Sequence, residues 1–127
     1  MPSSRLLRLK LVLGPGTALG PGKTDLLESI DQTGSIAAAG RQLGMSYKRA
    51  WLLVETMNGC FKAPLVASVR GGKGGGVAHL TPAGKEVLRR FRKIESKSLA
   101  ANRKDIDALN GLAKLTRKRI STISSED

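Results

Sequence analysis

Residues 34–58 read GSIAAAGRQLGMSYKRAWLLVETMN and carry the signals for two short helices in succession. Ser35 is a favourable N-cap for a helix over residues 36–43, because a serine oxygen accepts a hydrogen bond from a backbone N–H that the first turn leaves unpaired. Ser46 stands in the same way before a second helix, over residues 47–58. We therefore expect two helices that each begin at a serine.

A three-residue turn that opens with Gly44 separates these helices. Glycine readily adopts the left-handed conformation that ends many helices. The second helix has apolar side chains at the i, i+3, i+4, i+7 spacing that buries one face, namely Ala50, Leu53, Val54 and Met57. Two helices joined in this way are typical of a helix-turn-helix.

The residues that follow predict a two-stranded wing and a long helix. Strands are expected over residues 65–70 and 77–80, joined by the GGKGGG loop at residues 71–76. Thr81 and Pro82 suit the N-cap and first position of the long helix.

Upstream, leucines alternate with other residues over residues 5–13, a period of two that is typical of a half-buried strand. We expect this N-terminal strand to join the wing sheet. The glycine- and proline-rich residues 14–22 predict a connector, and an apolar stripe predicts a helix over residues 23–33. The expected fold is α+β but mainly α: a winged helix-turn-helix with a long C-terminal dimerisation helix.

The composition points to a polyanionic partner. The chain has 127 residues, a mass of 13.5 kDa and 22 Lys and Arg against 10 Asp and Glu, which gives a formal net charge of +12. Nucleic acid is the commonest counter-charge for so basic a domain. One cysteine and one histidine exclude a disulfide framework and a multi-cysteine zinc site. No apolar run is long enough to cross a membrane and no signal-peptide pattern opens the chain, so we expect a reduced, soluble, cytoplasmic protein.

The second predicted helix begins with candidate DNA contacts. In a helix-turn-helix, the first side chains of this helix enter the major groove. Arg49 is a candidate for a bidentate contact to guanine, and Tyr47 and Lys48 for contacts to phosphate or a base edge. Ser35 and Ser46 belong to the same surface, although capping alone explains Ser46. The wing adds a lysine and backbone N–H groups that suit phosphate, at Arg70, Gly72, Lys73 and Gly74.

Other reactive or aromatic residues favour structural roles. Trp51 lies one position outside the apolar face, as a core-rim residue or a DNA-facing aromatic. Cys60 is expected to act as a small, buried apolar residue, and His79 to lie at the surface or edge of the wing. Residues 14–24 approach a nucleotide-binding loop, but Thr17 stands where that motif requires glycine. No nucleophile–base pair is evident, so we assign no catalytic residue and expect no enzyme.

The long predicted helix is highly charged but has an apolar stripe for dimerisation, formed by Leu88, Phe91, Ile94 and Leu99. Asn102 and Asn110 are candidate breaks in this helix. We divide the chain into a DNA-binding domain at residues 1–84, a dimerisation and linker region at 85–118, and a polar tail at 119–127.

The strings Ser46-Tyr47-Lys48-Arg49-Ala50-Trp51 and Glu55-Thr56-Met57-Asn58 occur together with the GGKGGG wing loop. In this combination they resemble the N-terminal DNA-binding domain of the ModE family of molybdate-responsive bacterial transcriptional regulators. The helix-turn-helix is also similar, more loosely, to that of LysR-type regulators. The resemblance implies a winged helix-turn-helix that dimerises and binds a partly palindromic operator of molybdate-transport and molybdenum-enzyme genes.

ModE-family proteins also carry C-terminal molybdate-binding β-barrel domains, and the residues after Leu115 are too few to form them. The chain is then either a single-domain relative or a portion of a longer regulator, and we assign it no cofactor and no metal or molybdate ligand. We expect a homodimer that binds double-stranded DNA and no membrane. The alternatives are an RNA-binding or ribosome-associated basic protein, and a partner that heterodimerises with a full-length regulator.

Overall fold

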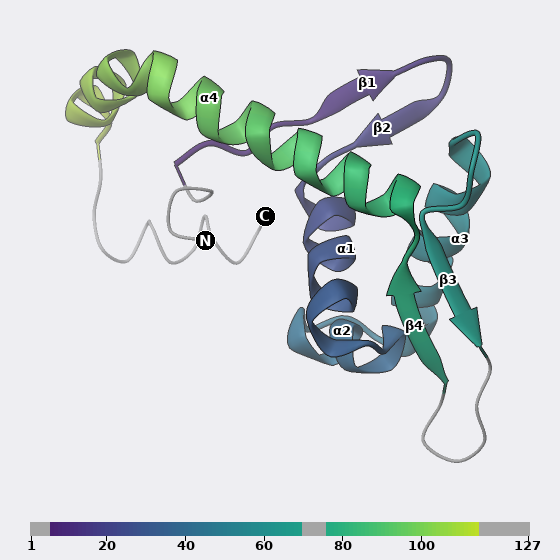
Figure 1. Cartoon of the computed structure of the whole chain (residues 1–127). Helices are drawn as coiled ribbons and strands as arrows, with labels where there is room; N and C mark the ends of the chain where they lie inside the picture. The colour runs from purple at the N-terminus through teal and green to yellow at the C-terminus, as the bar shows by residue number, and fades with distance from the viewer. Residues whose placement is uncertain (1–5, 70–75, 115–127) are drawn as a thin grey trace.

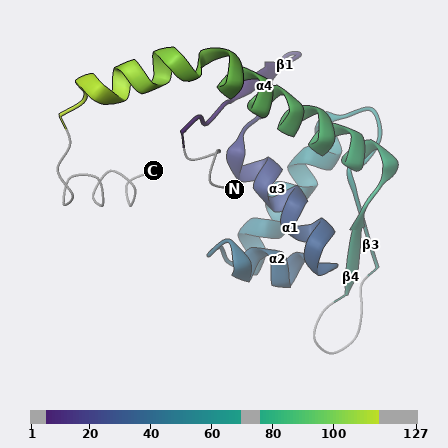
Figure 2. The ribbon, with the colours of Figure 1, turned by 60° about the vertical axis from the view of Figure 1, so that its left-hand side comes forward.

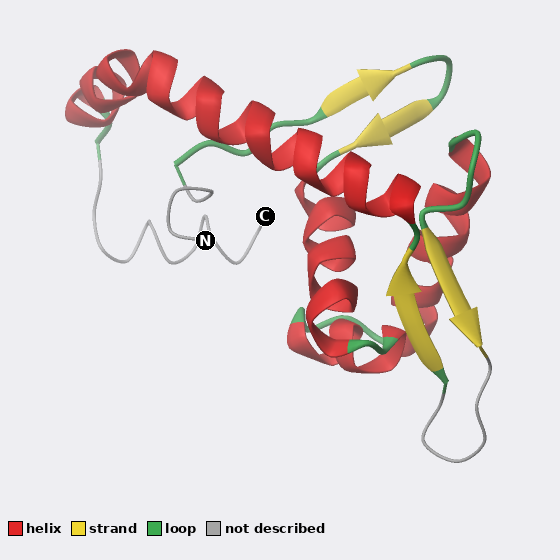
Figure 3. Cartoon of the chain, in the orientation of Figure 1, coloured by secondary structure: helices red, strands yellow, loops and turns green. Residues whose placement is uncertain are grey.

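The computed structural model describes residues 6–69 and 76–114. These residues form a mainly helical α+β structure with two small antiparallel sheets (Figures 1 and 3). The elements are, in chain order, β1 (Leu11–Leu13), β2 (Thr17–Leu19), α1 (Pro21–Thr33), α2 (Ile36–Gln42), α3 (Tyr47–Cys60), β3 (Val66–Val69), β4 (Val77–Leu80) and α4 (Pro82–Leu112).

Helices α1, α2 and α3 pack together into one unit, here called the head, and the β3–β4 ribbon lies beside it (Figure 1). The ribbon is joined to the head by a backbone hydrogen bond in which the N–H of Ala78 donates to the carbonyl of Gly34 over 2.8 Å. One hydrophobic core runs through head and ribbon; its buried residues are Leu26, Leu27, Ile30, Ile36, Ala39, Ala50, Val54, Met57, Leu65, Val66, Ala78 and Leu80. The ribbon is therefore held in a defined place beside α3.

The predicted starts of three helices are confirmed by their caps. The hydroxyl of Ser35 accepts from the N–H of Ala38 at 3.0 Å, and the hydroxyl of Ser46 accepts from the N–H of Arg49 at 3.1 Å. Thr81 caps α4 in the same way. Gly44 has a φ of +72°, so the turn between α2 and α3 uses the left-handed conformation expected of it.

The end of α3 differs from the prediction. The sequence predicts that the helix ends at residue 58, before Gly59, but it continues through Cys60 to an extended residue at Phe61. The buried face of α3 ends at Met57, one turn earlier, so Cys60 is exposed rather than buried. His79 is exposed on β4, as expected.

The N-terminal strand is also corrected. In the described part of the predicted strand only Leu11–Leu13 forms a strand, and it pairs with Thr17–Leu19 instead of joining the ribbon. Gly14 and Gly16 have φ values of +53° and +79°, which reverse the chain directly after Leu13. The partner of β1 is therefore β2, whose residues lie within the segment 14–22 for which the sequence predicts a connector.

Helix α4 is one continuous helix of 31 residues that passes over the head and extends beyond it (Figures 1 and 2). It is not broken at Asn102 or Asn110. The Asn102 side chain donates to the carbonyl of Ser98 at 2.8 Å, one turn back, which accommodates the asparagine within the helix.

Candidate nucleic-acid interface

The first turn of α3 presents its side chains to solvent. Tyr47 is 57% exposed, and Lys48 and Arg49 are also exposed. Ala50, Val54 and Met57 form the buried stripe of the same helix, against the core. The serine cap and the buried stripe together fix how α3 is turned: Lys48 points away from the core, and Tyr47 and Arg49 lie on the two flanks of the helix.

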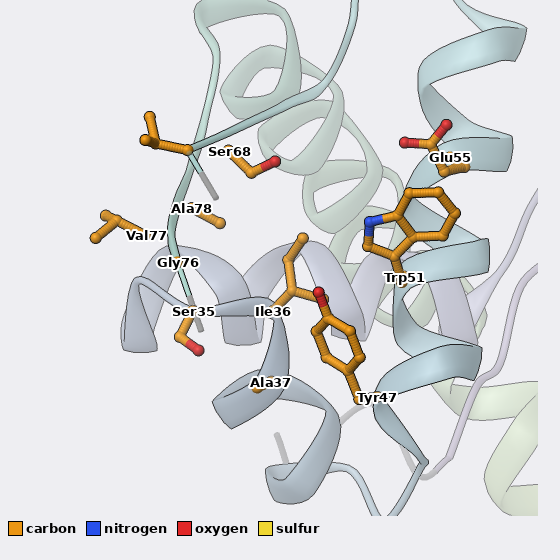
Figure 4. Close-up of a pocket in the computed structure, with 11 residues that line it drawn as sticks. Ser35, Ile36, Ala37, Tyr47, Trp51, Glu55, Ser68, Gly76, Val77 and Ala78 are labelled. Atoms are coloured by element: carbon orange, nitrogen blue, oxygen red, sulfur yellow. The ribbon is translucent and has the colours of Figure 1, made fainter. Parts of the chain in front are cut away.

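A groove of about 260 Å³ separates α3 from the ribbon (Figure 4). Tyr47, Trp51 and Glu55 project into it from one side of α3, and Ile36 and Ala78 line the other parts of its wall. Trp51 is 37% exposed, so it is at once a rim residue of the core and an aromatic on the open face.

The side chain of Asn58 sets the position of the ribbon relative to α3. Its Oδ1 accepts from the backbone N–H of Leu65 at 2.8 Å and of Val66 at 3.1 Å, and its Nδ2 donates to the carbonyl of Val66 at 3.0 Å. One amide thereby satisfies three backbone groups between α3 and β3. Sequence reasoning did not assign this role to Asn58, because its partners lie seven and eight residues away across a turn that has no regular spacing.

The exposed basic side chains on the head have no acidic partner among the described residues. Arg41, Lys48 and Arg49 form no ion pair there. The described acids Asp25, Glu28 and Glu95 instead surround Arg92 on α4, each at 2.9 Å. Three described acids are thus engaged at the α1–α4 contact and do not neutralise the cations on α2 and α3.

Arg92 links α4 to α1. Its side chain is only 20% exposed. Burial lowers the pKa of this guanidinium, but hydrogen bonds to Asp25, Glu95 and Glu28 outweigh that effect and raise the pKa above its ordinary value. Arg92 therefore stays charged and is structural rather than free for a ligand.

The structure brings together only part of the predicted set. Ser35 lines the same groove as Tyr47, and Ser46 lines a second hollow of about 250 Å³ with Lys48 and Arg49. The predicted wing-tip contacts, Arg70, Gly72, Lys73 and Gly74, lie outside the described residues. Sequence reasoning also left out residues on the outward face of α3, namely Leu52, Glu55 and Thr56, which are all exposed.

In the described ranges 6–69 and 76–114, no helix has the length and apolar character of a membrane span. No His, Cys, Asp and Glu side chains there are grouped so as to hold a metal ion.

The chain is similar to curated proteins of molybdenum metabolism. It is 40% identical over 96 residues to the "Molybdenum transport protein ModE" of Azotobacter vinelandii, which covers 75% of this chain and 36% of that protein. It is 38% identical over 71 residues to the "DNA-binding transcriptional dual regulator ModE" of Escherichia coli K12, covering 56% of this chain and 27% of that protein. The chain is ModE-like.

The ModE-like chain is also 46% identical over 81 residues to the "Molybdenum-pterin-binding protein MopB" of Rhodobacter capsulatus, covering 64% of this chain and 30% of that protein. It spans about a third of the length of the curated relatives that it matches. No protein-family model matches the chain.

Proposed function

We propose that this ModE-like chain is a sequence-specific duplex-DNA-binding regulator of transcription that acts on molybdenum-related genes. Helix α3 enters the major groove, and the ribbon with its GGKGGG loop follows the adjacent backbone as the wing of a winged helix-turn-helix. The observation that carries the proposal is the exposed, serine-capped start of α3 with Tyr47, Lys48 and Arg49, standing beside a ribbon that Asn58 holds in place.

The charges support a polyanionic ligand on this face. Lys48 and Arg49 have no acidic partner among the described residues, and two of the three acids of α1, Asp25 and Glu28, pair with Arg92. Lysine and arginine that neutralise phosphates release bound cations, so the affinity for DNA is expected to fall steeply with salt. Relatives named as ModE supply the link to transcription and molybdenum.

A homodimer through α4 is the second part of the proposal. Of the four predicted dimerisation residues, Phe91 and Leu99 are buried within the chain, Leu88 is half-buried and Ile94 is 39% exposed. Two more exposed leucines lie where α4 extends beyond the head, at Leu109 and Leu112. We propose that Ile94, Leu109 and Leu112 form the contact, in a cytoplasmic regulator whose DNA-binding part is residues 1–84.

The test is a selection of duplexes by the whole 127-residue chain from random and genomic DNA fragments, with structured RNA as competitor at matched salt. The proposal expects enrichment of one partly palindromic site, including fragments upstream of molybdate-transport genes, and weak competition by RNA. Equal affinity for all duplexes, or stronger competition by RNA, would overturn it. Sedimentation equilibrium of wild type and Leu109→Glu tests the dimer, which the charged variant is expected to weaken.

A further inference from the structure

The outward side of α3 carries two side chains, Leu52 and Glu55, for which the fold itself gives no explanation. At about 100° per residue, the side of α3 opposite its buried face bears Lys48, Leu52 and Glu55, spaced i, i+4 and i+7. This ridge stands between the two hollows on this face, since Glu55 lines one and Leu52 lines the other. All three of its side chains are exposed.

Glu55 is an acid on a face that otherwise offers cations. It forms no ion pair with any described residue, and the α3 positions within four residues of it carry no Lys or Arg. In Figure 4 it lies one turn after Trp51 at the mouth of the groove. An ionised carboxylate only accepts hydrogen bonds, so a ligand that uses Glu55 must present a donor.

Leu52 is 49% exposed on the same ridge. A single exposed leucine is common on protein surfaces, so exposure alone has no meaning here. The position of Leu52 is informative, because it lies on the ridge between Lys48 and Glu55, three residues before Glu55. Three residues advance the helix by about 4.5 Å, close to the ~3.4 Å step between successive bases.

We propose that Glu55 and Leu52 determine base preference at two neighbouring positions of the bound DNA: Glu55 accepts a hydrogen bond from the N4 amino group of a cytosine, and Leu52 packs on the C5 methyl group of a thymine. Both groups lie in the major groove, where a carboxylate and an apolar side chain are their usual protein partners. The inference rests on the proposed function, because it requires α3 in that groove.

A carboxylate at this place also makes binding selective. The phosphates of any DNA sequence repel the carboxylate. Only a correctly placed cytosine, which donates a hydrogen bond to it, compensates for this repulsion. Replacing Glu55 with alanine removes both the charge and the acceptor, and is therefore expected to strengthen binding to random duplexes while it weakens the cytosine preference. If Glu55 were only a solvent-exposed residue without a contact to DNA, its replacement would not raise the affinity for random duplexes and lower the cytosine preference at the same time.

The experiment uses the duplex that the wild-type chain enriches most in the selection, with one chemical group changed on a single base. N4-methylcytosine keeps the base pair but removes the major-groove donor, and deoxyuridine removes the thymine methyl group. For wild type, one N4-methylcytosine position is expected to lower affinity about 5- to 100-fold, and one deoxyuridine position about fourfold.

The variants then assign each effect to its side chain. Glu55→Ala, which has no side-chain acceptor, is expected to lose most of the sensitivity to N4-methylcytosine, and Leu52→Ala the sensitivity to deoxyuridine, each leaving the other intact. Asp105→Asn, an exposed acid on the far part of α4, makes the same one-unit charge change and is expected to keep both sensitivities.

Two failures are distinguishable. If the wild-type chain selects no duplex over random DNA, the proposed function and this inference both fail. If it selects a site but Glu55→Ala and Leu52→Ala retain the wild-type sensitivities at every position, the inference alone is wrong and other residues read the bases.

Discussion

Arg49 and Lys48 are neighbours in the first turn of α3, yet we expect them to contribute to DNA binding in different ways. Arg49 can make a bidentate contact to guanine, so Arg49→Ala is expected to lower the preference for the selected site by about 1–3 kcal/mol, concentrated at one base pair. Lys48→Ala is expected to weaken binding to all duplexes and to lower the salt slope by about one. Fluorescence anisotropy on selected and random duplexes at several salt concentrations measures both effects.

Arg49→Lys is the matched control for geometry, because lysine keeps the charge but has no planar fork. It is expected to resemble Arg49→Ala on the selected site and wild type on random DNA. Equal losses for Arg49→Ala on both kinds of duplex would assign Arg49 to the phosphates instead.

Ser46 caps α3 and also lies on the proposed DNA face, and two substitutions separate these roles. Ser46→Ala removes the acceptor for the N–H of Arg49 and is expected to destabilise the fold by about 1 kcal/mol. Ser46→Asp restores a cap but adds a negative charge, so it is expected to keep the stability and to lose DNA affinity. Chemical denaturation and anisotropy on the same samples test this; full DNA affinity in the aspartate variant would place Ser46 away from phosphate.

At the scale of elements, Gly84 is a position where α4 passes close to the backbone of Leu65, just before β3. A Cβ there would overlap the carbonyl oxygen of Leu65, and the same oxygen accepts the N–H of Thr81. Gly84→Ala is expected to destabilise the protein by about 1–3 kcal/mol through this steric clash. Gly111→Ala, in the same helix but in open space, is expected to stabilise it by up to about 1 kcal/mol. Urea denaturation compares them, and equal stabilities would show that α4 shifts freely at its start.

Elements whose signals are local could be predicted from the sequence. Ser35, Ser46 and Thr81 mark helix starts because the groups they cap lie three residues ahead in the chain. The β1–β2 hairpin could not be placed in the same way, because its pairing depends on the conformations of Gly14 and Gly16 rather than on hydrophobic alternation. For the candidate site, local signals identified the start of α3 and its apolar face, but not the groove between α3 and the ribbon, whose walls come from residues far apart in the chain.

At the scale of the whole molecule, the head is tied to α4 by an ion-pair network that no local pattern indicates. The carboxylates of Asp25 and Glu28 lie 67 and 64 residues from Arg92 in the chain. In the sequence, Arg92 is one of many basic residues on a charged helix. The net charge therefore suggested the kind of partner but not which cations are free to meet it.

Arg92 is expected to be the main polar determinant of how α4 sits on α1. Arg92→Met removes all three hydrogen-bonded ion pairs and leaves the partly buried carboxylates of Glu28 and Glu95 without their partner. We expect a loss of about 1–3 kcal/mol in the free energy of unfolding, measured by urea denaturation at fixed protein concentration.

Arg90→Met is the matched control two residues earlier on the same helix. The pair that it breaks, Arg90 with Glu86, is exposed and lies within α4, so a loss below about 0.5 kcal/mol is expected. Arg92→Lys keeps a charge but cannot hold three carboxylates in one plane, and its stability is expected to fall between those of wild type and Arg92→Met. If Arg92→Met were no less stable than Arg90→Met, apolar packing alone would hold α4 on the head, and the orientation of the proposed dimer helix would be independent of this network.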